Sequence, residues 1–136
     1  VMIIMKLVGL LLLVAVFSCT KTNETGSVTC QGTGKHKAKV IRKGCEAYVF
    51  QIIEPAIEVQ ADWTEIFSKQ KYTNVISVMN YCSETADSKS LQSLTQGEII
   101  TFDLSPTKES CLINCFAFED APSKTYVASN ISACEN

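Results

Sequence analysis

Residues 36–55, HKAKVIRKGCEAYVFQIIEP, decide the fold class of this chain. Charged and apolar residues alternate over 36–42, which is the period of a strand with one buried face. Residues 47–53 follow with an aromatic and β-branched run that is typical of strands. A glycine and a cysteine break the pattern within 43–46, and Pro55 ends it because proline cannot donate to a strand ladder. The stretch therefore predicts a β-hairpin that bends at 43–46.

Further strands are predicted on the C-terminal side of this hairpin. Residues 73–82 and 98–104 alternate between apolar and polar side chains. The apolar segments at 111–118 and 125–132 each follow a turn that contains proline. Together with the hairpin, these segments predict six short strands.

One helix is expected between the second and third strands. Asp62 is followed by Trp63 and Thr64, and Glu65 stands three residues after Asp62. This spacing is that of a capping box, in which two side chains satisfy unpaired N–H groups at the start of a helix. We expect a helix over residues 62–71, with Trp63 buried against the sheet.

The predicted elements define a fold class. Residues 83–97 are rich in Ser, Thr, Asp and Gln, and only Leu91 and Leu94 could anchor them, so we expect them to form the longest loop. Six strands and one helix predict a mostly β domain, either a small antiparallel barrel or a half-open sheet of the oligonucleotide/oligosaccharide-binding (OB) type. The predicted helix would plug one end of the barrel, although it comes earlier in the chain than in a standard OB topology.

The N-terminal residues have the features of a secretory signal. Lys6 is followed by an apolar run, LVGLLLLVAVF, at residues 7–17. This run has the length of the apolar region of a signal peptide and is too short for a comfortable membrane span. It predicts an export signal and not part of the fold.

The run closes on Val-Phe-Ser-Cys at residues 16–19, which resembles a bacterial lipobox. A lipobox has an aliphatic residue three before the cysteine and a small residue directly before it, and Val16 and Ser18 match these positions. Phe17 is larger than the residue usually found between them. The resemblance implies that Cys19 is lipidated after the signal is removed.

The resemblance divides the chain into three parts. Residues 1–18 would be the signal peptide, 19–29 a lipidated polar tether, and 30–136 a single disulfide-stapled domain. Acyl chains on Cys19 would hold the protein on the membrane. An ordinary cleaved signal peptide is the alternative, because the same small residues also fit the general signal peptidase.

Seven cysteines are present, and lipidation of Cys19 would leave an even number to pair. These six are expected to form disulfides in an oxidising compartment: Cys30, Cys45, Cys82, Cys111, Cys115 and Cys134. Cys111 and Cys115 would lie about 13 Å apart in one strand, which is too far for a bond between them.

One pairing follows if the last two strands form a hairpin that turns near Pro122. Cys111 then lies opposite Cys134, which leaves Cys30 to pair with Cys45 and Cys82 with Cys115. This is one of fifteen possible connectivities. A zinc or redox site is not expected, because the sequence has no Cys-x-x-Cys and His36 is its only histidine.

Five basic residues crowd one short stretch: Lys35, Lys37, Lys39, Arg42 and Lys43. They could form a cationic face for anionic headgroups or a polyanionic ligand. They could equally be the solvated face of an edge strand, and this interpretation is favoured. The chain after Cys19 carries 11 basic and 14 acidic side chains, a net charge of −3, which argues against nucleic-acid binding.

The aromatic residues also allow two interpretations. They could form a stacking platform of the kind that OB folds use, or they could form the buried core, which is favoured in so small a domain. These residues are Tyr48, Phe50, Phe102, Phe116 and Phe118.

No catalytic residues and no cofactor are expected, because no nucleophile has a suitably placed base. The sequence predicts a lipid-anchored binding protein of the bacterial cell envelope, at the outer membrane or cell surface. Its partner would be the membrane itself and an unidentified protein or glycan. The alternative is a soluble secreted inhibitor of a protease or lysozyme that presents residues 83–97.

Overall fold

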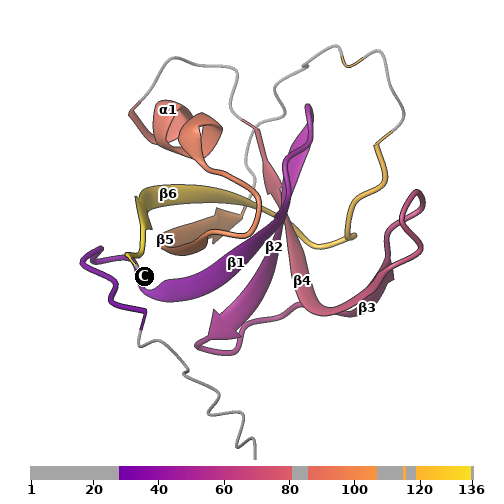
Figure 1. Ribbon diagram of the computed structural model, residues 1–136, viewed down its shortest axis with the longest axis horizontal. Helices are drawn as coiled ribbons and strands as arrows, with labels where there is room; N and C mark the ends of the chain where they lie inside the picture. Colours follow the sequence, from indigo (N-terminus) through magenta and orange to yellow (C-terminus); the bar gives the residue numbers. More distant parts are fainter. Residues whose placement is uncertain (1–27, 81–85, 107–114, 116–118, 136) are drawn as a thin grey trace, which may run out of the picture.

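The computed structural model describes residues 28–80, 86–106, 115 and 119–135. These residues contain six strands and one helix (Figure 1). The prediction of a mostly β domain with one short helix is confirmed. The elements run in the order β1 (His36–Arg42), β2 (Ala47–Glu54), β3 (Gln60–Thr64), β4 (Lys71–Met79), α1 (Ala86–Ser93), β5 (Ile99–Pro106) and β6 (Thr125–Ala133).

Five of the strands close into a ring. β1 pairs with β2 and β5, β2 also pairs with β4, and β6 joins β4 to β5. All these pairs are antiparallel except β4 with β6, which is parallel, so the sheet is mixed, where the sequence predicted an antiparallel barrel or a half-open sheet. β3 pairs with β4 alone and lies outside the ring.

The apolar side chains that face one side of these strands fill the inside of the ring. Val40, Phe50, Ile76 and Phe102 are fully buried there, and the rings of Phe50 and Phe102 meet edge to face at 5.3 Å. Such pairs add to the free energy gained from burial alone. The prediction that Phe50 and Phe102 belong to the core, not to an exposed platform, is therefore confirmed.

The segment predicted as a helix at residues 62–71 is instead a strand and a turn. Residues 60–64 form β3, and the chain returns as β4. The D-W-T-E pattern is a local signal, and the ladder between Trp63 and Tyr72 overrides it. The burial of Trp63 is nevertheless confirmed, because only 5% of its surface is exposed.

The helix lies where the longest loop was predicted. α1 occupies residues 86–93, so the prediction of a loop over 83–97 is wrong for this segment. Leu91 and Leu94 reach the inner core and are buried, which closes one end of the barrel. Asp87 accepts a hydrogen bond from the backbone N–H of Asn130 on β6 at 2.9 Å, which ties the start of the helix to the sheet.

Two disulfides are present among the described residues, and neither is one of the predicted pairs. Cys30 is bonded to Cys134, where the chain before β1 forms a bridge with the end of β6. Cys45 is bonded to Cys115. The predicted bonds Cys111–Cys134, Cys30–Cys45 and Cys82–Cys115 are therefore wrong, because each uses a cysteine that is bonded elsewhere.

The bend between β1 and β2 is held by a carboxylate from the far end of the sequence. Glu119 accepts hydrogen bonds from the backbone N–H groups of Cys45 and Glu46, the second at 2.9 Å. Gly44 approaches Glu119 so closely that a side chain at position 44 would collide with it. The second disulfide and Glu119 together fix this bend to the segment that leads into β6.

Several predictions fall outside the described residues. They concern the signal peptide, Cys19, Cys82, Cys111, Phe116 and Phe118, and a strand at 111–118, of which only Cys115 is described. Among the described residues, no helix has the length and apolar character needed to cross a membrane.

Candidate ligand groove beside the β3–β4 hairpin

The five basic residues of the sequence cluster do not form one cationic face. Lys37 lies 3.9 Å from Glu54, and the ammonium of Lys43 donates to the backbone carbonyl of Gln92 at 2.9 Å. Lys35 is exposed beside the first residues of β1. Lys39 is exposed on the outer face of β1 and lines one groove, whereas Lys35 and Lys37 line a separate pocket of about 520 Å³.

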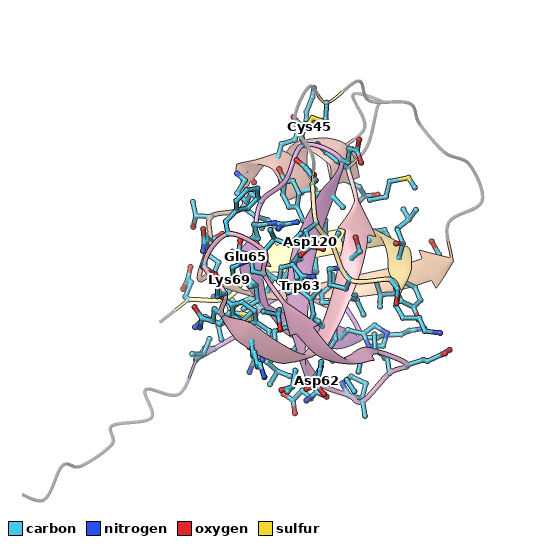
Figure 2. All side chains as sticks on the ribbon, turned by 90° about the vertical axis from the view of Figure 1, so that its right-hand side faces the viewer. Cys45, Asp62, Trp63, Glu65, Lys69 and Asp120 are labelled. Carbon is cyan, nitrogen blue, oxygen red and sulfur yellow. A yellow bond between two sulfur atoms is a disulfide. The ribbon has the colours of Figure 1, made fainter. Side chains whose placement is uncertain are left out.

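Arg42 serves the structure of the outer face. Its guanidinium carbon lies 5.2 Å from the centre of the Trp63 ring, in the range of a cation–π contact. The same guanidinium is 3.8 Å from Glu65 and donates to the backbone carbonyl of Asp120. Figure 2 shows Trp63 next to Asp120, with Glu65 and Lys69 at the end of the hairpin. The contacts of Arg42 with Trp63 and Glu65 therefore stabilise the position of the β3–β4 hairpin.

A second, smaller core lies under the hairpin, on the outside of the ring. It consists of Ile41, Val49, Trp63 and Val75, with Tyr72 packed against it. The rings of Trp63 and Tyr72 are stacked with their centres 5.8 Å apart. The left-handed backbone of Asn74, with a φ of 55°, marks the point where β4 passes from the ring into the hairpin. Trp63 therefore covers the outer faces of β1, β2 and β4.

A groove of about 540 Å³ runs between the hairpin and the outer face of β1. Its lining comes from three separate parts of the chain: Lys39, Val40 and Ile41 of β1, Gln70 and Tyr72 of the hairpin, and Gln96 and Gly97 of the turn before β5. This volume is within the range of small-ligand sites.

Two backbone hydrogen bonds fix the turn before β5 to Val40 of β1. Gly97 donates its N–H to the carbonyl of Val40 at 2.8 Å, and Val40 donates to the carbonyl of Glu98 at 2.9 Å. Gly97 has a φ of 95°, which side chains disfavour. The carboxylate of Glu98 is occupied by the N–H of Thr95, 2.6 Å away, so it stabilises the turn.

The groove combines one cation, two amide side chains and one aromatic ring. Lys39 can donate to an anionic group, Gln70 and Gln96 can both donate and accept, and Tyr72 offers an apolar ring with a hydroxyl. Of these residues, the sequence pointed only to Lys39. The others are 31 to 57 positions away along the chain, and only the strand order brings them together.

One group of possible metal ligands among the described residues has no free thiolate. Cys45, Cys115 and Glu119 bring their ligand atoms within 4.8 Å of one another, but the two sulfurs are joined in a disulfide and offer no thiolate to a metal. Tyr48 lies 5.7 Å from the ammonium of Lys43, and burial raises the pKa of its hydroxyl. This side chain belongs to the inner core.

No protein-family model matches this chain, and no curated protein or solved structure matches it either.

Proposed function

We propose that the protein is a lipid-anchored binding protein of the bacterial cell envelope that holds acidic saccharides in the groove beside the β3–β4 hairpin. The observation that carries the proposal is the meeting of Lys39, Tyr72 and two glutamine amides at one groove.

The connectivity of the ring supports assignment to the OB type. β1, β2 and β4 are neighbours in succession, and β5 returns to lie beside β1, which is a Greek key. β6 then completes a five-stranded barrel, and α1 comes after the third strand of the ring, later than the helix predicted at 62–71. Barrels of the OB type bind oligonucleotides and oligosaccharides.

The number of charges favours a saccharide with one carboxylate over a nucleic acid, which carries a phosphate at every nucleotide. The net charge after Cys19 is −3, which opposes the approach of a polyphosphate. In addition, the outer face of the second and third ring strands, which OB proteins use for ligands, is covered here by Trp63. The groove beside the hairpin lies next to this covered face and is the site we propose for the ligand.

The chemistry of the groove matches a sugar acid. A carboxylate can accept from the ammonium of Lys39, and hydroxyl groups can exchange hydrogen bonds with the amides of Gln70 and Gln96. The ring of Tyr72 can pack against the apolar face of a sugar ring. A single cation suits one carboxylate per binding site.

Two observations support export and anchoring. The sequence ahead of the domain resembles a lipobox at Cys19, and two disulfides are typical of extracytoplasmic proteins. Figure 1 places the described residues ahead of β1, 28–35, and the β3–β4 hairpin at opposite sides of the barrel. An anchored domain would therefore present the hairpin away from the membrane.

Ligand binding is tested by calorimetric titration of the full chain without its anchor, made as Cys19→Ala. A neutral oligosaccharide that carries one uronic acid should bind, and the same oligosaccharide after reduction of its carboxyl group should bind at least tenfold more weakly. Equal binding of the two would contradict the role of Lys39.

Anchoring is tested separately by detergent partitioning of cells. The wild-type protein should follow the membrane fraction, and Cys19→Ala should move it to the soluble fraction. A wild-type protein that is already soluble, with an unmodified cysteine, would show that the signal is of the ordinary cleaved kind.

A further inference from the structure

The pocket of about 520 Å³ that Lys35 and Lys37 line lies where the chain ahead of β1 meets the sheet. Part of its lining comes from residues 28–35, which we call the strap. The sheet supplies the rest, including Lys37 of β1, Glu54 at the end of β2 and Thr101 of β5. None of these residues lines the groove beside the hairpin, so the two cavities are separate. We call this cavity the strap pocket.

The strap is fixed to the sheet at both of its ends. Near its start, Cys30 is bonded to Cys134 after the last strand. At its end, the backbone N–H of Lys35 donates to the carboxylate of Asp103 on β5 at 3.0 Å. The walls of the strap pocket are therefore in place before a ligand arrives, so binding costs little order in the protein.

Three polar side chains form a row across neighbouring strands along the strap pocket. Lys37 is paired with Thr101 on one side and with Glu54 on the other. Side chains of directly paired residues lie on the same face of a sheet, close to one another. A hydroxyl, an ammonium and a carboxylate therefore stand side by side, and all three residues line the pocket.

The ion pair within this row is a loose one. The Lys37 ammonium lies 3.9 Å from the Glu54 carboxylate, whereas a hydrogen bond between such charged groups is about 2.7 to 2.9 Å long. Both groups can therefore form hydrogen bonds with a ligand. Because the row offers one charge of each sign, it suits a ligand that also carries both charges, and not a simple anion.

The strap pocket also has two polar atoms that lack a hydrogen-bond partner among the described residues. They are the hydroxyl of Thr101, a residue that is only 7% exposed, and Nδ1 of His36. A side chain at position 32 would collide with the Thr101 hydroxyl, so Gly32 keeps side-chain atoms away from it. Burying a hydroxyl without a partner lowers stability. Its place at a pocket indicates that it serves a ligand.

We propose that the strap pocket binds a free amino acid with an apolar side chain. The carboxylate of the amino acid accepts hydrogen bonds from the Lys37 ammonium and the Thr101 hydroxyl, and its ammonium donates to Glu54. Each charge of the ligand thus meets the opposite charge on the protein. Val28 and Pro55, which also line the pocket, offer an apolar surface to the side chain. This binding does not depend on a saccharide in the groove.

Calorimetric titration of the full chain carrying Cys19→Ala with L-valine tests the proposal. L-valine should bind. N-acetyl-L-valine has no ammonium and L-valinamide has no carboxylate, so each should bind at least tenfold more weakly. The proposal is overturned if L-valine does not bind up to about 10 mM. It is also overturned if either derivative binds as tightly as L-valine, because one of the two charges would then have no role.

Substitutions in the row separate a role in binding from a role in the fold. Glu54→Gln and Thr101→Val should each weaken the binding of L-valine at least tenfold. Glu46→Gln makes the same change at an exposed carboxylate that does not line the pocket, and should leave the affinity unchanged.

Thr101→Val has a second expected result. It replaces an unpartnered hydroxyl with a methyl group of similar size, so the midpoint of thermal unfolding should not fall. Circular dichroism measures this midpoint. A lower midpoint together with unchanged affinity for L-valine would show that the hydroxyl serves the fold, and would overturn the proposal.

Discussion

The guanidinium of Arg42 lies over the indole ring of Trp63, with 5.2 Å between the guanidinium carbon and the ring centre. Arg42 belongs to the first strand and Trp63 to the hairpin outside the ring, so this contact joins the hairpin to the barrel. It also fixes one wall of the groove, because Tyr72 stacks on Trp63 and lines the groove.

Replacing Trp63 should destabilise the domain strongly. Trp63→Ala removes the centre of the outer core and leaves a cavity, for which the expected loss is about 3 to 5 kcal/mol in the free energy of unfolding. Phe67→Ala on the same hairpin is the control and should change it by less than about 0.5 kcal/mol, because Phe67 is exposed. Urea denaturation monitored by circular dichroism measures both values. Equal effects would contradict the outer core.

Removing the disulfide between Cys30 and Cys134 should also destabilise the domain. Its cysteines are 104 positions apart, and closing a loop of this length restricts the unfolded chain by about 4 to 5 kcal/mol in the chain-entropy treatment. The double variant Cys30→Ala with Cys134→Ala should lose a large part of that in denaturant unfolding. A change below about 1 kcal/mol would show that the bond constrains little.

Peptide mapping without reduction tests the connectivity. Peptides that contain Cys30 and Cys134 should be crosslinked, and so should those that contain Cys45 and Cys115. A crosslink between Cys111 and Cys134 would contradict the fold at the end of β6.

Acid should weaken the junction between the N-terminal segment and the sheet. The backbone N–H of Lys35 and the amide of Asn130 donate to Asp103 and lower the pKa of its carboxyl below the ordinary value of 3.8. Because the pKa is lowered on folding, the carboxylate contributes stability above pH 3.8, and this contribution is lost as the pH falls through the lowered pKa. Asp103→Asn should therefore be less stable than the wild type at neutral pH.

The pH dependence of the stability difference shows whether the charge of the Asp103 carboxylate is its source. The difference in unfolding free energy between Asp103→Asn and the wild type should shrink as the pH falls below 3.8. Glu46→Gln, at an exposed side chain, is the control for removing one carboxylate. A difference for Asp103→Asn that does not change with pH would show that the carboxylate charge is not its source.

The strands of the ring could be predicted because their signal is short-range. Burial of one strand face imposes a period of two, and the apolar residues at 36–42 and 98–104 follow it. The run at 47–53 is buried on both faces, and its aromatic and β-branched residues predicted that strand. β3 could not be predicted, because D-W-T-E is a sound helix start in isolation. Only the partner strand, through the pairing of Trp63 with Tyr72, decides against the helix.

The helix and the disulfides depended on the same kind of distant information. Among the described side chains of α1, Leu91 alone is buried, so the sequence of this helix looks like a loop until the barrel end is known. Cys134 was matched to the wrong cysteine because the bridge between Thr29 and Glu135 joins the two ends of the domain. In the groove, Lys39 was found from local charge, whereas Tyr72 and Gln96 arrive there only through strand order.

The most direct test of the proposed site is the affinity of the groove for an oligosaccharide that carries one uronic acid, measured by calorimetry in the parent protein, Lys39→Ala and Lys89→Ala. Both substitutions remove one exposed lysine, but Lys89 lies on α1 and does not line the groove. Loss of one charged hydrogen bond of about 1.5 kcal/mol should weaken binding roughly tenfold in Lys39→Ala. Lys89→Ala should bind like the parent protein. Unchanged affinity in Lys39→Ala, or an equal loss in both variants, would contradict the proposed site.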